Sequence, residues 1–158
     1  MKLPIEIRKF KESDLDECIS LFRDTVHTVN TKHYTQSQVD VWAPANIDKA
    51  VWNKQLAENI TYVAIYNNQV VGFGCMTPQG YFDLLYVHKD FQRQGIAKSI
   101  VLKFETLAKQ LGIKEITTET SITAKPFRES MGYQVVKQQL KEFRGEKFIN
   151  YVMKKVIK

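Results

Sequence analysis

The chain has 158 residues, of which 44% are apolar and 25% are charged, and its net charge is +6. This length predicts one domain over residues 1–158, and the composition is that of a globular protein, which excludes a collagen, a coiled coil or a disordered chain. No apolar run approaches the ~18 residues of a membrane span, so no membrane segment is expected. Because charges interrupt residues 1–8, we expect no secretory signal there.

Cysteine and histidine are sparse and widely spaced. Cys18 and Cys75 lie far apart, and we expect them to be small core residues of a protein that works in the reducing cytoplasm. The three histidines, His27, His33 and His88, lack the spacing of zinc ligands, so no metal is predicted.

The first third of the chain is mostly helical in pattern. Alternation at residues 5–7 predicts a short strand. Ser13 is expected to cap a helix whose apolar stripe runs over 15–29. The capping-box spacing at 35–38 predicts a second short helix, and Asn46 is expected to cap a third that ends near residue 58.

The rest of the chain alternates strands and helices. Asn67 and Asn68 tolerate positive φ and predict a tight hairpin, and Gly112 is expected to end the long helix. The third strand of this part is nearly all apolar and is expected to be central and covered on both faces. We predict strands at 62–66, 70–76, 81–87, 113–120, 133–136 and 148–153, and helices at 97–111 and 122–131. This order predicts an α/β (α+β) fold, a mixed sheet with helices packed on it.

The segment most informative about function is the loop that leads from the third strand into the long helix. A helix start leaves several backbone N–H groups unpaired, and with the helix dipole they form an anion site. Gly95 and Ala97 are small enough for a phosphate to approach the backbone, and Arg93 and Lys98 add positive charge. The spacing is neither that of a P-loop nor that of a dinucleotide fingerprint. The alternative is an ordinary strand-to-helix loop.

This loop resembles a known family. Gln92-x-x-Gly95-x-Ala97 matches the Gln/Arg-x-x-Gly-x-Gly/Ala motif of the GNAT acetyltransferases. The resemblance implies a mixed central sheet of about six or seven strands flanked by four or five helices. It also implies acetyl-CoA as acyl donor, with its pyrophosphate held at the loop and its pantetheine arm beside the preceding strand. The cofactor-binding residues it implies are Leu85, Tyr86, Val87, Gln92, Arg93, Gln94, Gly95, Ile96, Ala97 and Lys98.

The resemblance extends over nearly the whole chain, with two departures. Phe127 and the Gly132-Tyr133 pair resemble the short helix and strand on the far side of the cofactor, and segments 33–35, 42–44 and 150–154 resemble the YafP-like branch of the family. Many members carry a tyrosine that protonates the coenzyme A thiolate, and Arg128 stands at that position. Ser121 stands where many carry an asparagine bonded to the pantetheine arm.

Acetyl transfer to an amine requires a neutral amine, a donor for the carbonyl oxygen and a way for the thiolate to leave. Asp83 and Glu119 are the candidate general bases, although a carboxylate at either position is more often structural, and a water chain without a dedicated base is a further alternative. Tyr86 and Tyr133 are candidate acids, while Arg128 is a candidate for stabilising the thiolate as a fixed charge. For the acceptor we predict His33, Tyr34 and Trp42 at the pocket mouth, the alternative being that Trp42 only closes the core.

The sequence therefore predicts an N-acetyltransferase that moves an acetyl group from acetyl-CoA to a primary amine by direct attack in a ternary complex. The acceptor is expected to be a small molecule or a peptide, and the enzyme a monomer or homodimer. A non-catalytic acyl-CoA-binding module is the alternative. The basic stretch 137–158, which carries +5 of the net charge, raises nucleic-acid binding as a third reading, but no recognition motif accompanies it, so no nucleic-acid partner is predicted.

Overall fold

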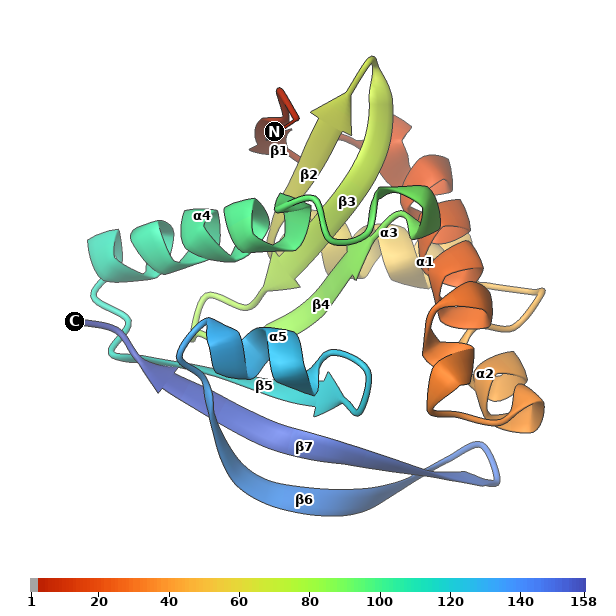
Figure 1. Cartoon of the computed structure of the whole chain (residues 1–158). Coiled ribbons are helices and arrows are strands. Elements are labelled where there is room, and N and C mark those ends of the chain that lie inside the picture. The colour runs from red at the N-terminus through yellow and green to blue at the C-terminus, as the bar shows by residue number, and fades with distance from the viewer. Residues whose placement is uncertain (1–2) are drawn as a thin grey trace.

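The computed structural model describes residues 3–158, and Met1 and Lys2, where the predicted domain begins, lie outside the described residues. Within 3–158 the chain forms seven strands in two sheets and five α-helices (Figure 1). The predicted α/β fold, with six or seven strands and four or five helices, is thereby confirmed, although the strands form two antiparallel sheets joined by one parallel bridge and not one continuous mixed sheet. No helix in this range is long and apolar enough to cross a membrane.

The elements follow one another in the predicted order, with short 3₁₀ turns at Glu12–Asp14, Asn30–Lys32 and Lys89–Phe91. The strands are β1 (Glu6–Lys9), β2 (Ile60–Tyr66), β3 (Gln69–Met76), β4 (Phe82–Val87), β5 (Glu115–Ser121), β6 (Gln134–Phe143) and β7 (Glu146–Val156). The helices are α1 (Leu15–Thr28), α2 (Gln36–Trp42), α3 (Lys49–Glu58), α4 (Ile96–Gln110) and α5 (Lys125–Ser130).

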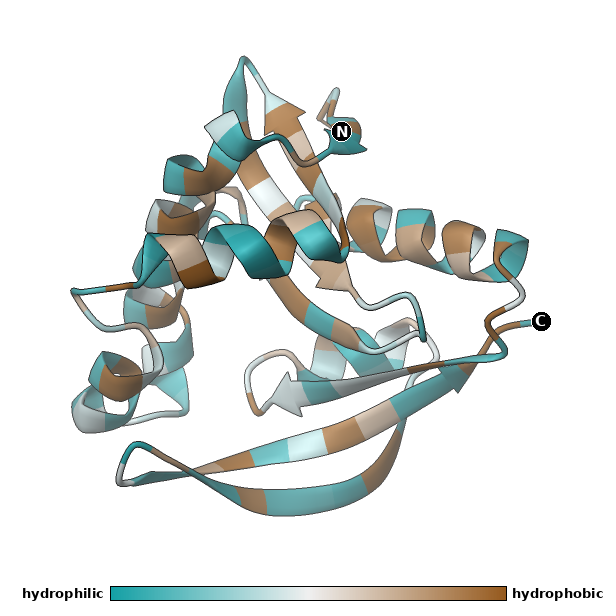
Figure 2. Cartoon of the chain, turned by 180° about the vertical axis from the view of Figure 1, so that it is seen from behind, coloured by the Kyte–Doolittle hydropathy of each residue, from teal (hydrophilic) through white to brown (hydrophobic). Residues whose placement is uncertain are grey.

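The first sheet, in the order β1-β2-β3-β4, is antiparallel throughout and is covered by helices on both faces. Along β3, successive side chains point alternately to the two faces of this sheet. A Cβ on Gly74 would lie 2.9 Å from Phe104 of α4, so the small residues of β3 let this helix lie close to the strand. Phe73 points to the opposite face, where α1 and α3 pack. Hydrophobic and hydrophilic residues alternate along the helices in Figure 2, as expected for helices that pack one side on a sheet and expose the other to solvent.

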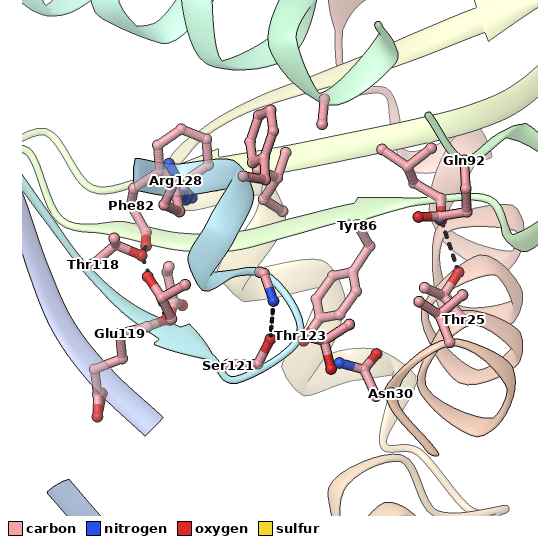
Figure 3. A pocket seen from close by; sticks show the side chains of 18 of the residues that line it. Thr25, Asn30, Phe82, Tyr86, Gln92, Thr118, Glu119, Ser121, Thr123 and Arg128 are labelled. Atoms are coloured by element: carbon pink, nitrogen blue, oxygen red, sulfur yellow. Dashed lines mark hydrogen bonds between the residues drawn. The ribbon is translucent and has the colours of Figure 1, made fainter. Parts of the chain in front are cut away.

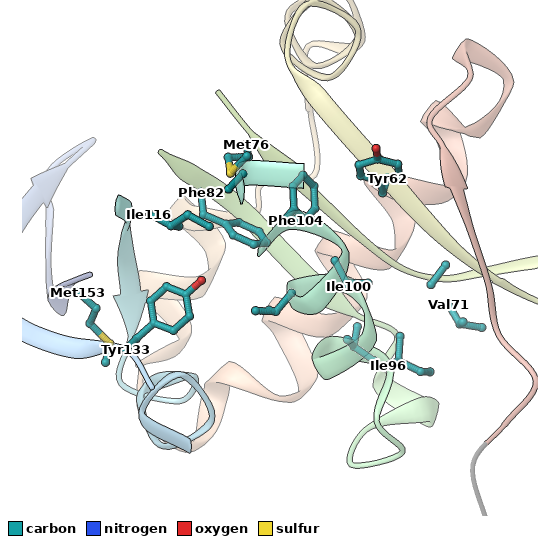
Figure 4. Packing of buried hydrophobic residues seen from close by; sticks show 14 residues of the cluster. Tyr62, Val71, Met76, Phe82, Ile96, Ile100, Phe104, Ile116, Tyr133 and Met153 are labelled. Atoms are coloured by element: carbon teal, nitrogen blue, oxygen red, sulfur yellow. The ribbon is translucent and has the colours of Figure 1, made fainter. Parts of the chain in front are cut away.

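The main core lies between α4 and the sheet and continues to the second sheet (Figure 4). Phe82, Phe104 and Ile116 are fully buried there, and they join β4, α4 and β5. On the other side of the first sheet, Cys18 and Cys75 are buried and free, which confirms that they are core residues.

The second sheet, in the order β5-β7-β6, has longer strands than the sequence predicts. Strand β6 has ten residues and β7 eleven, against predictions of four and six. The hairpin turn at Arg144 and Gly145, both at positive φ, joins β6 to β7. The residues on either side of this turn are mostly polar and lack the alternation of apolar and polar residues by which a strand is recognised in a sequence. Pairing between neighbours thus extends strands that a hydrophobic pattern does not reveal.

The Asn67–Asn68 hairpin is confirmed, with φ of 49° and 61° at its two residues. The capping box at Thr35 is confirmed as well, since its side chain accepts from the Gln38 amide. Two predicted helix starts are wrong. Asp48, and not Asn46, caps α3, because only its carboxylate reaches the amides of the first turn.

Ser13 does not cap α1. It lies inside the 3₁₀ turn that precedes this helix, and Asp14 organises that turn. The Asp14 carboxylate accepts the Lys11 amide at 2.8 Å and both guanidinium nitrogens of Arg8 at 2.8 and 2.9 Å. The side-chain bond from Arg8 outweighs the opposing effect of burial and lowers the pKa of Asp14.

The two sheets meet where β4 and β5 begin. Tyr81 and Thr117 form a parallel bridge, the Thr117 amide donates to the Gly80 carbonyl at 3.0 Å, and the Thr118 hydroxyl donates to the Phe82 carbonyl at 2.8 Å. Beyond these contacts the strands separate. The prediction that β4 is covered on both faces is therefore only partly right, because residues 83–86 are half-exposed along the opening.

We expect Asp14→Ala to lower the free energy of unfolding at neutral pH by about 2–4 kcal/mol, because it leaves a charged guanidinium and an amide without their acceptor. Asp16→Ala is the matched control: Asp16 is 76% exposed, and its pair with Lys49 is worth at most about 1 kcal/mol. Urea unfolding measures both. Since the folded pKa of Asp14 is lowered, its contribution is present above the ordinary value of about 3.9 and is lost as the pH falls below it. Equal losses in the two variants would contradict this role of Asp14.

Candidate active site

A cavity of about 220 Å³ lies between the separating strands β4 and β5, and we call it the donor cavity (Figure 3). Helices α1, α2 and α5 and the loop before α4 complete its walls. Its lining residues are Thr25, Val29, Asn30, Trp42, Phe82, Asp83, Leu85, Tyr86, Val87, Gln92, Ala97, Thr118, Glu119, Thr120, Ser121, Thr123, Ala124, Phe127 and Arg128.

One edge of β4 is left open toward this cavity. The His88 amide donates to the Val71 carbonyl of β3 at 2.8 Å. Because hydrogen-bonded and non-hydrogen-bonded residues alternate along an antiparallel pair, the backbone N–H and C=O groups of Val87 and Leu85 point away from β3. The Val87 carbonyl accepts from the Thr25 hydroxyl at 3.0 Å and from the Gln92 amide nitrogen at 2.7 Å. The Leu85 amide, on the same edge, faces the donor cavity and is available to a ligand.

The loop after β4 ends in a helix start with free amides. Gly95, at φ 82°, precedes α4, and no side chain caps this helix. The Ser99 amide donates to the Gly95 carbonyl at 3.0 Å, which leaves the amides of residues 96–98 without an intrahelical acceptor. Apart from Gly95 and its own chain neighbours, no heavy atom of the described residues lies within 4 Å of where a Gly95 Cβ would be. The predicted anion site is open in the folded chain.

The predicted cofactor-binding residues of this loop take different places. Gln92 and Ala97 line the cavity, and Gln92 also ties the loop back to β4 through the Val87 carbonyl. Ile96 points its side chain into the core. The exposed side chains of Arg93, Gln94 and Lys98 surround the helix start without lining the cavity, and Arg93 lies at φ 60°.

On the far side of the cavity, Ser121 and Phe127 both line the wall. The Ser121 hydroxyl accepts the Ala124 amide at 3.0 Å and so shapes the turn into α5.

Arg128 lies deep in the donor cavity and is only 3% exposed. Its guanidinium carbon lies 4.4 Å from the centre of the Phe82 ring and 5.0 Å from that of Tyr133. Burial lowers the pKa of Arg128, although a guanidinium stays protonated near neutrality. Its buried Nη1 has no hydrogen-bond partner in residues 3–158, so a permanent positive charge faces the cavity with unused donor capacity.

A second cavity, of about 450 Å³, lies beyond β4 among α1–α3 and strands β5–β7, and we call it the acceptor cavity. Five residues line both cavities: Trp42, Asp83, Tyr86, Glu119 and Ser121. The two cavities therefore meet along β4 and β5.

Two of the three predicted acceptor residues lie at this cavity. The rings of Tyr34 and Trp42 line it, 5.4 Å apart and edge to face. The Tyr34 hydroxyl is occupied, since it donates to the Ile149 carbonyl at 2.6 Å and accepts the Ile122 amide at 3.0 Å. His33 lines neither cavity and instead bonds to the Thr123 hydroxyl at 2.9 Å on the surface.

Asp83 lies at an irregularity of β4. Cys75 pairs with Leu84 and Met76 with Phe82, which leaves Asp83 as the extra residue of a β-bulge. Its carboxylate accepts from the Gln55 amide nitrogen of α3 and forms no ion pair within residues 3–158. Burial raises the pKa of Asp83, and the charge of Glu119 raises it further.

Glu119, by contrast, is held by three partners. Lys141 donates to its two carboxylate oxygens at 2.9 and 3.1 Å, and Tyr81 and Gln139 donate at 3.1 and 2.5 Å. Burial is the largest single effect and opposes ionisation, but the hydrogen bonds and charge of Lys141, together with the hydrogen bonds from Tyr81 and Gln139, outweigh it and lower the pKa of Glu119. The two carboxylates thus have opposite pKa shifts because only one has a cation beside it.

The two candidate acids are separated. Tyr86 lines both cavities, and burial raises its pKa. Tyr133 lies in the core, where its hydroxyl donates to Glu105 of α4 at 3.0 Å. It lines neither cavity. Of the two, only Tyr86 is at the junction.

Sequence reasoning missed a group of acceptor-cavity residues that come from α1, α3, β4, β6, β7 and the turn before β4. They are Phe22, Trp52, Gln55, Tyr81, Leu84, Lys141, Phe143, Phe148 and Asn150. Trp52 and Gln55 are three residues apart, so they share one face of a helix, but no motif indicates what that face meets. Within 3–158 no three His, Cys, Asp or Glu side chains are grouped to hold a metal ion.

Comparison with known proteins identifies the class of protein to which this site belongs. The acetyltransferase (GNAT) domain family matches residues 30–155. The chain belongs to the GNAT acetyltransferase family. Over 153 residues, which cover 95% of each chain, it is 37% identical to YafP of Escherichia coli (strain K12), an uncharacterized N-acetyltransferase. The family, its YafP-like branch and the enzyme class predicted from the residues are confirmed.

Solved structures share the fold. A GCN5-related N-acetyltransferase from Rhodopseudomonas palustris is 25% identical, with a TM-score of 0.94 over 99% of this chain and 97% of that one. The PaiA N-acetyltransferase of Thermoplasma acidophilum, solved in complex with coenzyme A, is 18% identical, with a TM-score of 0.76 over 98% and 99% of the two chains.

We expect Gly95→Glu to weaken acetyl-CoA binding at least ~10-fold, about 1.4 kcal/mol, because a carboxylate then competes for the free amides at the start of α4. Gly112→Glu is the matched control: Gly112 ends the same helix, has φ 73°, and is equally open. Both substitutions strain a left-handed residue, so thermal unfolding should shift similarly. Isothermal titration with acetyl-CoA separates them, and equal affinities would remove the helix start from the donor site.

Proposed function

We propose that the chain acts as one acetyltransferase domain that moves an acetyl group from acetyl-CoA to a primary amine by direct attack in a ternary complex. The observation that carries this proposal is the junction of the two cavities at Asp83, a carboxylate without a cationic partner in residues 3–158. An acetyl donor in one cavity and an acceptor amine in the other would be adjacent at this junction. The amine could then attack the thioester directly, and no covalent enzyme intermediate would be needed.

The donor would bind along surfaces that are already unpaired. The pyrophosphate lies at the amides of residues 96–98, with Arg93 and Lys98 close by as positive charges. The pantetheine arm runs along the open edge of β4, at Leu85 and Val87, in the manner of an added strand. Ser121 and Phe127 form the opposite wall.

Asp83 is the better general base of the two carboxylates. Its raised pKa makes it a stronger base than an ordinary aspartate, whereas Glu119 is held ionised by Lys141. The bound ammonium gives a proton to Asp83 and becomes a neutral amine. Its nitrogen forms a bond to the thioester carbon, and the Leu85 amide donates to the carbonyl oxygen as that oxygen becomes negative.

The intermediate then collapses, the carbon–sulfur bond breaks, and the nitrogen releases its second proton to solvent. Coenzyme A leaves as a thiolate. Arg128, buried and with an unpartnered Nη1, stabilises that thiolate as a fixed charge, and water protonates it afterwards. Tyr86 is the alternative proton donor at the junction.

A thiol-release assay over a panel of primary amines tests the function as a whole. Acetyl-CoA binding without release to any amine would instead indicate the non-catalytic acyl-CoA-binding module. A cytoplasmic location and a monomer or homodimer remain predictions, as does the absence of a nucleic-acid partner, for which salt-dependent DNA binding is the counter-test.

We expect Asp83→Asn to lower kcat by about 10²–10⁴-fold, the usual contribution of a positioned base, with little change in acetyl-CoA affinity. Because the pKa of Asp83 is raised, wild-type kcat/KM should increase with pH through a value above the ordinary ~3.9, and this step should be lost in Asp83→Asn. Asp24→Asn, the same change at an exposed position, is the control. A large loss in Glu119→Gln with Asp83→Asn near wild type would assign the base to Glu119.

We expect Arg128→Met, which keeps the packing volume and removes the charge, to lower kcat by about 10²–10³-fold, whereas Tyr86→Phe stays near the wild-type rate. Ultraviolet absorbance of the thiolate in enzyme-bound coenzyme A gives a readout independent of rate. Its pKa should lie below the free-thiol value of about 8.5 in the wild type and return toward it in Arg128→Met. A large loss of kcat confined to Tyr86→Phe would make Tyr86 the acid.

A further inference from the structure

The acceptor cavity has a composition that points to one class of amine. We propose that the acceptor is a monocationic primary amine on a flat aromatic body, such as an arylalkylamine. This inference rests on the proposed function, since it names the acceptor of that same site.

Aromatic rings dominate the cavity. Eight of its fifteen lining residues are Phe, Tyr or Trp, against 11% in the whole chain. They are Phe22, Tyr34, Trp42, Trp52, Tyr81, Tyr86, Phe143 and Phe148. An enrichment of this size at one cavity favours a ligand that offers a flat apolar surface.

The rings are fixed against one another before any ligand binds. Trp42 contacts Tyr34 at 5.4 Å and Phe148 at 6.2 Å between ring centres. On the other wall, Phe22 contacts Trp52 at 4.8 Å and Tyr86 at 4.9 Å. Walls held in this way lose little conformational freedom when a ring stacks on them, which favours a rigid ligand.

The charges of the cavity match a single cation. Asp83 and Glu119 are its carboxylates and Lys141 is its cation. Lys141 neutralises Glu119, so only Asp83 is free to pair with an ammonium. A polyamine or an aminoglycoside carries further cations. These would be repelled by Lys141 and would have no second free carboxylate to pair with, so both classes are disfavoured.

The polar groups are few as well. Gln55 is already bonded to Asp83, and the hydroxyls of Tyr34 and Tyr81 are bonded as well. Besides Asp83, a ligand therefore meets Ser121, Asn150, the Tyr86 hydroxyl and the indole N–H groups of Trp42 and Trp52. The buried Oδ1 of Asn150 has no hydrogen-bond partner in residues 3–158 and accepts one donor. An amino sugar would bury several hydroxyl groups here without partners, whereas an aromatic amine with at most one further N–H or O–H would not.

Binding is the first test, because both tryptophans of the chain line this cavity and report on it. We expect 2-phenylethylamine and tyramine to change the tryptophan fluorescence of the full chain saturably, at least ten times more tightly than spermidine, kanamycin, glucosamine or an alanyl peptide. With acetyl-CoA present, kcat/KM should follow the same order. Tighter binding or faster acetylation of any amine of the second group would overturn the proposal.

Phe143→Ser and Leu140→Ser form a matched pair on β6. Phe143 is 41% exposed and lines the cavity, whereas Leu140 is 62% exposed and does not, so both variants should fold. We expect Phe143→Ser to raise KM for 2-phenylethylamine about fivefold or more, without changing acetyl-CoA affinity, and Leu140→Ser to leave both unchanged. An equal KM in the two variants would count against stacking in this cavity.

Failure of the proposed function gives a different result. Arylalkylamine binding with no acetylation of any amine would overturn the enzyme activity and retain the ligand class. Acetylation confined to polyamines or peptides would retain the activity and overturn the ligand class.

Discussion

The parting of β4 from β5 is the constraint on which the rest of the site depends. Two adjacent strands in one fold ordinarily satisfy each other's backbone groups, yet here the Thr117 amide and the Thr118 hydroxyl hold the strands together only at their beginning. Beyond Phe82 this edge of β4 has no strand partner among residues 3–158, and buried backbone groups do not remain unpaired without cost. Thr25 and Gln92 satisfy the Val87 carbonyl, while the Leu85 amide is left for a ligand. The cavity is therefore a consequence of strand pairing that stops early.

Two charged side chains lie beside this opening, the buried Arg128 and the half-buried Asp83, and neither forms an ion pair within residues 3–158. Arg128 is stacked between two aromatic rings with no hydrogen-bonded carboxylate, and Asp83 accepts from an amide and not from a cation. Both are costly in a folded chain unless a ligand supplies the missing opposite charge. An ammonium would do so for Asp83 and a thiolate for Arg128. The charge distribution of the site thus complements the reaction it is proposed to carry out.

The β-bulge gives Asp83 its position. In a regular strand the Asp83 side chain would point to one face of the sheet, opposite to its neighbours Phe82 and Leu84. As the extra residue of the bulge, Asp83 instead lines both cavities. Glu119 on β5 also lines both, and Lys141 from β6 decides that it stays an ionised, paired carboxylate. The difference between the proposed base and the paired carboxylate therefore comes from neighbours on other elements, Gln55 of α3 and Lys141 of β6.

The sequence by itself determined the order of elements, the family and the loop at which an anion is predicted to bind. Local chemistry specifies these features: the Asn67–Asn68 turn, the capping box at Thr35, and the small residue Gly95 before an amphipathic helix. Only the tertiary structure decided which carboxylate is unpaired, that Tyr133 turns into the core toward Glu105, and that rings from α1, α2, α3, β4, β6 and β7 line one cavity. These outcomes depend on contacts between residues far apart in the chain, such as Asp83 with Gln55 and Glu119 with Lys141. Propensity, periodicity and capping act over a few residues, so they carry no information about such pairs.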